Sequence, residues 1–221
     1  MSQVPFALFL GIVGGLISLS FLVRYAVQGQ FEKYSGVSSE EYLSVKELFE
    51  RVKKDEGLEE ISFEEGEDEF GGSYLREEGR IRVPRVKEST LLSLGITAHE
   101  IAHAVQEKEK KLTIKFVTWL ESLGVVLTYI FPLFLVAGFI FYFPLLYLGL
   151  GFYGAIILIC LIEIPVEVEA SRKAIIYLER YQEITEGERK RLKRLLGLAI
   201  LTRLTYLTVG YLNLIDFDAE R

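Results

Sequence analysis

Four long apolar stretches and two charged segments make up most of this 221-residue chain. The stretches cover residues 4–23, 116–141, 145–164 and 195–215, and Arg203 interrupts the last of them. A helix needs about 20 mostly apolar residues to cross the hydrocarbon core of a bilayer. The pattern therefore predicts about four transmembrane helices in a mainly α membrane protein.

The two middle stretches predict a transmembrane hairpin over residues 112–165. Phe141-Tyr142-Phe143-Pro144 separates them, and aromatic residues with a proline are typical of a turn at the membrane interface. Residues 4–23 have no basic start and no small-residue cleavage site, so this stretch is predicted to be an uncleaved anchor.

In residues 30–111 apolar and polar residues follow one another at short intervals, and this pattern predicts a small α+β domain. Ser39 or Ser44 can cap a helix that runs to about Lys54 and buries a stripe of leucine, phenylalanine and valine. Three short β-type runs separated by glycine-bearing turns predict a small antiparallel sheet. These runs cover residues 61–63, 73–75 and 81–83.

The basic residues predict the orientation in the membrane. Residues 24–115 and 166–194 hold 23 of the 25 Lys and Arg, whereas the turn at 141–144 has none. The positive-inside rule places such segments in the cytoplasm. Both charged segments, including a helix predicted to begin near Pro165, should thus lie on the cytoplasmic face of the cell membrane.

Composition narrows the possible chemistry. Half of the residues are hydrophobic and the net charge is −6. The sequence has no basic patch that would indicate binding to nucleic acid. The single cysteine, Cys160, lies in an apolar run, which excludes an intrachain disulfide and a cysteine metal site.

The only two histidines stand four residues apart, in His99-Glu100-Ile101-Ala102-His103. On a helix, residues i and i+4 share a face, so both imidazoles can bind one metal ion. This spacing is the zinc-peptidase motif, in which the glutamate acts on the water that the metal activates. The alternative interpretation is a pair of solvated or core histidines on an amphipathic helix.

A catalytic zinc ion needs a third protein ligand, which must here be a carboxylate. Glu163, Glu167 and Glu169 cluster around the end of the third apolar stretch. Glu163 lies in the last turn of that stretch, where a carboxylate is costly, whereas Glu167 follows it closely. Spacing alone does not choose between them, and Glu167 and Glu169 could also form a solvated acidic face balanced by Arg172 and Lys173.

The segment from Ala98 to Gln106, with Pro165-Val166-Glu167 and Ala170-Ser171-Arg172, resembles the YugP-type neutral zinc metallopeptidases of bacterial and archaeal membranes. This resemblance covers most of the chain and implies a membrane-embedded zinc protease with a zincin-like domain. Residues 167–171 also resemble the Glu-x-x-Ala-Asp element of HtpX-type and CAAX-prenyl proteases. That resemblance implies Glu167 as the zinc ligand, with Ser171 in place of the supporting aspartate.

These observations lead to the hypothesis of a gluzincin-like zinc (Zn2+) endopeptidase. It would hydrolyse membrane or membrane-proximal polypeptides at a site that faces the cytoplasm, with Glu100 as general base. Tyr74, Arg172 and Tyr206 are candidates for stabilising the oxyanion. The alternative is a non-catalytic membrane scaffold with a structural or vestigial zinc site, and the sequence gives no oligomeric state.

Two further expectations concern the surroundings of the site. Arg203 is predicted either to pair with Glu121 or Glu163 inside the helix bundle or to reach the interface. The exposed edge of the small sheet could receive a substrate as an added strand, or the sheet could serve packing alone.

Overall fold

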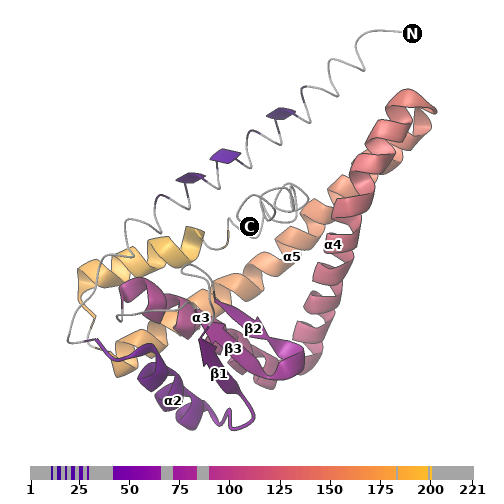
Figure 1. Cartoon of the computed structure of the whole chain (residues 1–221). Coiled ribbons are helices and arrows are strands. Elements are labelled where there is room, and N and C mark those ends of the chain that lie inside the picture. Colours follow the sequence, from indigo (N-terminus) through magenta and orange to yellow (C-terminus); the bar gives the residue numbers. More distant parts are fainter. Residues whose placement is uncertain are drawn as a thin grey trace. The chain divides into compact units, whose positions relative to one another are not determined.

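The structure is a computed structural model of the chain, and it describes residues 42–65, 72–83, 90–182, 184–198 and 200, with scattered positions between 11 and 29. The described part is mostly helical with one small sheet, which confirms the mainly α fold (Figure 1). The expected first and fourth membrane helices lie largely outside the described residues, as do Arg203 and Tyr206.

The chain divides into two compact units. One consists of Met1–Val27, Phe116–Ile164 and Leu201–Arg221, and the other of Gln28–Lys115 and Pro165–Ile200. The boundary between Ile164 and Pro165 falls inside a continuous helix.

Two long helices run through the first unit, α4 (Lys111–Ile140) and α5 (Pro144–Tyr181). They are joined by the three residues 141–143, so the predicted hairpin turn is confirmed. A small core holds them together, with the Phe131 and Tyr153 rings 5.2 Å apart and Ile156 fully buried.

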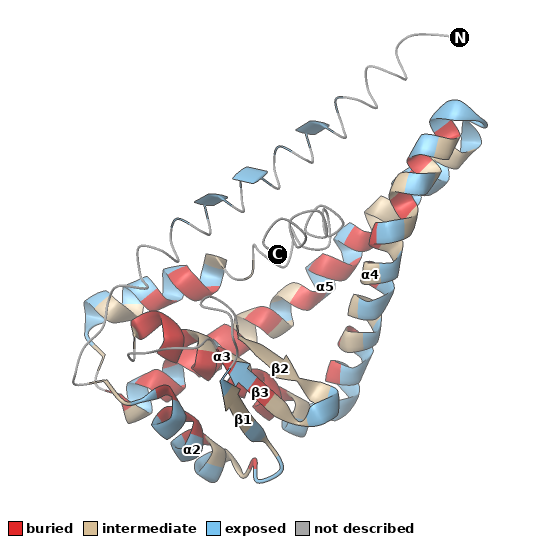
Figure 2. Cartoon of the chain, in the orientation of Figure 1, coloured by how far each residue is buried: buried red, intermediate tan, exposed pale blue. Residues whose placement is uncertain are grey.

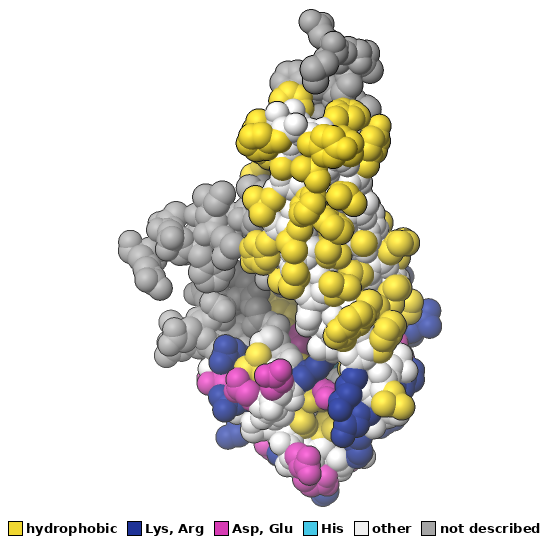
Figure 3. Space-filling model, turned by 90° about the vertical axis from the view of Figure 1, so that its right-hand side faces the viewer, with side chains coloured by type: hydrophobic (Ala, Val, Ile, Leu, Met, Phe, Trp, Pro, Cys, Tyr) yellow, Lys and Arg dark blue, Asp and Glu magenta, His cyan; other side chains and the backbone are white. Residues whose placement is uncertain are grey.

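Both long helices are long and apolar enough to cross a membrane. In each helix only 28% of the most apolar 18-residue segment is buried, whereas the core helix of a soluble protein would bury most of such a segment. Large hydrophobic side chains, among them Leu133, Val136 and Leu158, remain exposed on α4 and α5, and Figure 3 shows how densely such side chains cover one face.

Helix α2 (Val45–Glu56) lies in the second unit and is capped by Ser44, one of the two predicted alternatives. The Ser44 hydroxyl accepts from the Glu47 amide while the Glu47 carboxylate accepts from the Ser44 amide, so two otherwise unpaired amides are satisfied. Gly57 ends the helix at φ +62°, a conformation that favours glycine. Leu48 and Val52 are fully buried on its inner face.

The sheet contains β1 (Ser62–Glu65), β2 (Ser73–Leu75) and β3 (Arg80–Val83) in the order β1-β3-β2. A 3-10 turn, η1 (Arg76–Glu78), joins β2 to β3 and makes this pair antiparallel. The strands fall where the sequence predicts them, but the expectation of a wholly antiparallel sheet is wrong, because β1 pairs parallel to β3. The alternation of apolar and polar residues locates a strand, but it does not determine which strand it pairs with or in which direction.

Helix α3 (Leu91–Glu109) is the centre of the second unit and contacts α2, β2 and β3. Thr90 caps it, because its hydroxyl accepts from the Ser93 amide. The helix is buried on nearly all sides, and Figure 2 shows the buried positions concentrated on it. Its core partners include Ala170, Ala174 and Leu178 of α5.

Helix α5 continues through Pro165, so the predicted helix start near this proline is wrong. A proline inside a helix removes one backbone hydrogen bond to the preceding turn, yet buried residues on the following turns hold the helical course. Residues 186–198 form a further helix. A capping box opens this helix, because Thr185 and Glu188 exchange hydrogen bonds of 2.7 and 3.3 Å.

Candidate metal centre

Helix α3 brings the two histidines to one buried face, as their spacing predicts. His99 and His103 are only 7% and 3% exposed, and their Nε2 atoms lie 3.1 Å apart. The two rings meet edge to face with centroids 4.6 Å apart. Both imidazoles therefore present the same nitrogen to the same point.

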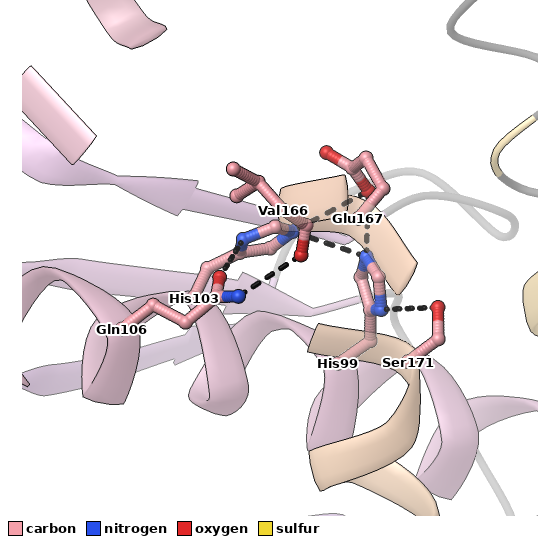
Figure 4. Close-up of polar contacts among 6 residues, drawn as sticks. All are labelled: His99, His103, Gln106, Val166, Glu167 and Ser171. Carbon is pink, nitrogen blue, oxygen red and sulfur yellow. Dashed lines mark hydrogen bonds and ion pairs between the residues drawn. The ribbon is translucent and has the colours of Figure 1, made fainter. Parts of the chain in front are cut away.

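Helix α5 supplies a carboxylate to that point (Figure 4). Glu167 Oε2 lies 3.2 Å from His99 Nε2 and 3.6 Å from His103 Nε2, and the Glu167 side chain is buried. The ligand atoms of the three residues all lie within 4.8 Å of one another. Among the described residues, this is the group of converging side chains that could hold a metal ion.

The chemistry of this donor set fits zinc. Two imidazole nitrogens and one carboxylate oxygen make a three-ligand protein site of the kind that leaves a fourth position for water or substrate. A buried carboxylate is also costly unless a positive charge compensates it, and a divalent cation would supply that charge. These three residues would therefore hold the zinc ion that the motif implies.

The other two candidate carboxylates do not belong to the converging group. Glu169 bonds the ammonium of Lys110 at 2.7 and 2.8 Å, and this hydrogen bond is the main reason why the pKa of Glu169 falls below its usual value. Glu163 is buried on α5, four residues before Glu167.

The far nitrogen of each histidine also has a neighbour. Ser171 Oγ lies 3.4 Å from His99 Nδ1, so the serine that replaces the expected aspartate faces a histidine. Gln106 Oε1 lies 3.1 Å from His103 Nδ1. The sequence reasoning gave Gln106 no role in the site, although its position three residues after His103 places it on the same side of the helix.

Glu100 is partly buried and lies against the start of β2. A Cβ added at Gly72 would stand 2.3 Å from Ile96 Cγ2 and 3.1 Å from Glu100 Cγ. The backbone of the β2 entry is thus packed directly on the predicted general base, and only a glycine leaves the room for this contact.

The oxyanion candidates have different surroundings. Burial and then the neighbouring carboxylate of Glu107 raise the pKa of Tyr74, whose hydroxyl bonds that carboxylate. Tyr74 therefore stays protonated, on the strand that begins beside Glu100. Arg172 is exposed on α5.

Known proteins resemble this chain over most of its length. The family described as "Putative neutral zinc metallopeptidase" matches residues 9–217. A protein of Bacillus subtilis (strain 168) named "Putative membrane protease YugP" is 25% identical over 215 residues, which cover 95% of each chain. No solved structure gives a significant match.

Proposed function

The chain belongs to the family described as "Putative neutral zinc metallopeptidase", and from this premise we propose that it is a multi-pass membrane endopeptidase that hydrolyses membrane or membrane-proximal polypeptides. His99, His103 and Glu167 hold the zinc ion, and Glu100 is the general base. The observation that carries the proposal is the convergence of three buried ligand atoms, two of them from α3, the helix that also bears Glu100, and one from α5.

When bound, zinc polarises the scissile carbonyl and lowers the pKa of water toward neutrality. Glu100 accepts a proton from the attacking water and delivers it to the departing amine, which requires hydrogen-bond reach of both. It is the partly exposed residue between two buried histidines, so water and substrate can approach its carboxylate.

The position of β2 supports an extended polypeptide as substrate. Among the described strands β2 is an edge of the sheet, and its entry at Gly72 packs on Glu100. A polypeptide that adds to such an edge forms main-chain hydrogen bonds regardless of its sequence. This arrangement would carry the scissile bond past the carboxylate of Glu100.

A membrane location is supported by α4 and α5 and by the relative's description as a membrane protease. The distribution of Lys and Arg supports a cytoplasmic orientation of the metal centre, because the basic residues fall in the segments that contribute α3 and the later half of α5.

The first experiment measures zinc in the purified full-length protein in detergent. We expect about one zinc ion per chain in the wild type and in Glu169→Gln, because catalytic sites use three protein ligands and Glu169 bonds Lys110 instead. Glu167→Gln should lose the ion. A wild type that binds no zinc after reconstitution would favour the non-catalytic scaffold.

The second experiment measures cleavage of an unfolded polypeptide such as casein, with mass-spectrometric detection of new termini. Glu100→Gln should keep its zinc and lose cleavage, because the amide cannot accept the proton. Glu109→Gln is the matched control, since Glu109 lies on the same helix and bonds Lys173 at the surface. Undiminished cleavage by Glu100→Gln would refute the mechanism.

A further inference from the structure

Gln106 is a fully buried polar side chain on α3, three residues after His103. The oxygen and the nitrogen of its amide each have a partner in the site (Figure 4), and the side chain also hydrogen-bonds the Glu169 carboxylate. Nε2 donates to the backbone carbonyl of Val166 at 2.9 Å, and Oε1 lies 3.1 Å from His103 Nδ1. One side chain therefore connects a histidine of α3 with the backbone of α5.

These contacts determine which atoms carry protons. The Val166 carbonyl can only accept a hydrogen bond, so the amide nitrogen of Gln106 must face it. The amide oxygen then faces His103 and can also only accept, so His103 Nδ1 must be the donor. A neutral His103 consequently carries its proton on Nδ1 and presents the lone pair of Nε2 to Glu167 and His99.

The second contact acts on the third ligand. Val166 directly precedes Glu167, so the hydrogen bond from Gln106 fixes the α5 backbone beside the carboxylate that faces both histidines. A second contact to α5 lies nearby, because Lys110 forms an ion pair with Glu169. Both of those side chains are more than a third exposed. Exposed ion pairs contribute little, so the buried amide is the stronger constraint.

We propose that Gln106 is a positioning residue that selects the metal-binding tautomer of His103 and fixes the backbone at Glu167. In this way one neutral side chain pre-forms two of the three ligands before a metal ion arrives. The inference rests on the proposed function only in taking the His-His-Glu group as a zinc site. Partners of ligating histidines typically change metal affinity by about 10–100-fold when they are removed.

The alternative is that Gln106 serves packing alone, and a matched variant separates the two roles. Gln182 is also buried, lies in the same unit and accepts a hydrogen bond of 2.8 Å from the Leu43 amide, away from the histidines. Gln106→Met and Gln182→Met make the same chemical change at the two places. Both remove a buried amide of similar shape, but only the first touches the metal centre.

The test uses the full-length protein in detergent, with two readouts. Zinc affinity is measured by competition with a chelator, and the histidine tautomers by 15N NMR of 15N-histidine-labelled, zinc-free protein at a pH where both imidazoles are neutral. Because the chain has two histidines, the spectrum contains only two imidazoles to assign.

We expect the wild type to show His103 as the Nδ1–H tautomer. Gln106→Met should lose this preference and lower zinc affinity roughly 10–100-fold, whereas Gln182→Met should match the wild type in both readouts. Gln106→Glu keeps an acceptor for His103 but sets a carboxylate against the Val166 carbonyl. It should therefore keep the tautomer and still lose zinc affinity.

Gln106→Met with an unchanged His103 tautomer and wild-type zinc affinity would overturn the inference, and so would an equal loss of affinity in Gln182→Met. A wild type that binds no zinc but whose His103 tautomer depends on Gln106 would support the positioning role and count against the proposed function. The two failures are thus distinguishable.

Discussion

Replacing Gly72 by alanine tests whether the entry of β2 is packed on the predicted general base. The added Cβ would stand 2.3 Å from Ile96 Cγ2, which is roughly 1–2 Å inside an ordinary carbon–carbon contact. Isoleucine is stiff at χ1 in a helix, so its methyl group cannot simply turn away. Either α3 or the start of β2 must move.

The magnitude follows from this overlap. Forcing one extra carbon into a packed region costs about 1–3 kcal/mol, and we expect Gly72→Ala to lose that much stability. The same Cβ would stand 3.1 Å from Glu100 Cγ, which pushes the carboxylate by a few tenths of an ångström. Cleavage should therefore fall further than stability explains, because misplacing a reacting group by about 1 Å can cost 10²-fold in rate.

The assay combines thermal unfolding in detergent, zinc content and casein cleavage. Gly187→Ala is the matched control, because its Cβ would meet only Thr185 Oγ1 at 3.8 Å. The double variant Gly72→Ala/Ile96→Ala removes the clashing methyl group, so it should be less destabilised than the sum of its single variants. A Gly72→Ala protein with wild-type stability and cleavage would refute the packing of β2 on Glu100.

Three further substitutions test other contacts. Ser171→Ala removes only a long 3.4 Å contact to His99, so in the chelator competition it should lower zinc affinity less than Gln106→Met. Burial raises the pKa of Tyr42 from 10.0 to about 12, and a hydrogen bond with the Glu188 carboxylate is the next largest cause. The contribution of Tyr42 to stability is thus complete below pH 10 and is lost as the pH rises to about 12, and Tyr42→Phe should reduce the loss of stability over this pH range in unfolding experiments. Pro165→Ala restores a donor inside α5 and should raise the unfolding temperature without changing zinc content, whereas a lower temperature would contradict the continuous helix.

The features that the sequence predicted correctly are local ones. The spacing of His99 and His103 brings them to one face because four residues make about one helical turn. The cap at Ser44 likewise involves Glu47, a residue only three positions away. The apolar stretches before and after the turn at 141–143 form long helices because their length and hydrophobicity are properties of each segment alone.

Only the tertiary structure decided what depends on distant partners. Alternation located the strands, but β1 pairs with β3 across a separation of 18 residues, and no local pattern encodes this choice. Likewise, three glutamates were available by spacing, and resemblance to known proteases favoured Glu167. The structure brings Glu167 to His99, 68 positions earlier, because α3 and α5 share one core.

The same reason accounts for the residues that sequence reasoning passed over. Gln106 acquires its role from the Val166 carbonyl, 60 positions away, and Gly72 from its contact with α3. The sequence alone therefore determined that His99 and His103 share one face of a helix with Glu100 beside them, since residues within about one helical turn form a local arrangement. The position of Glu167 and the contacts of Gln106 and Gly72 depend on long-range packing, and therefore on the whole fold.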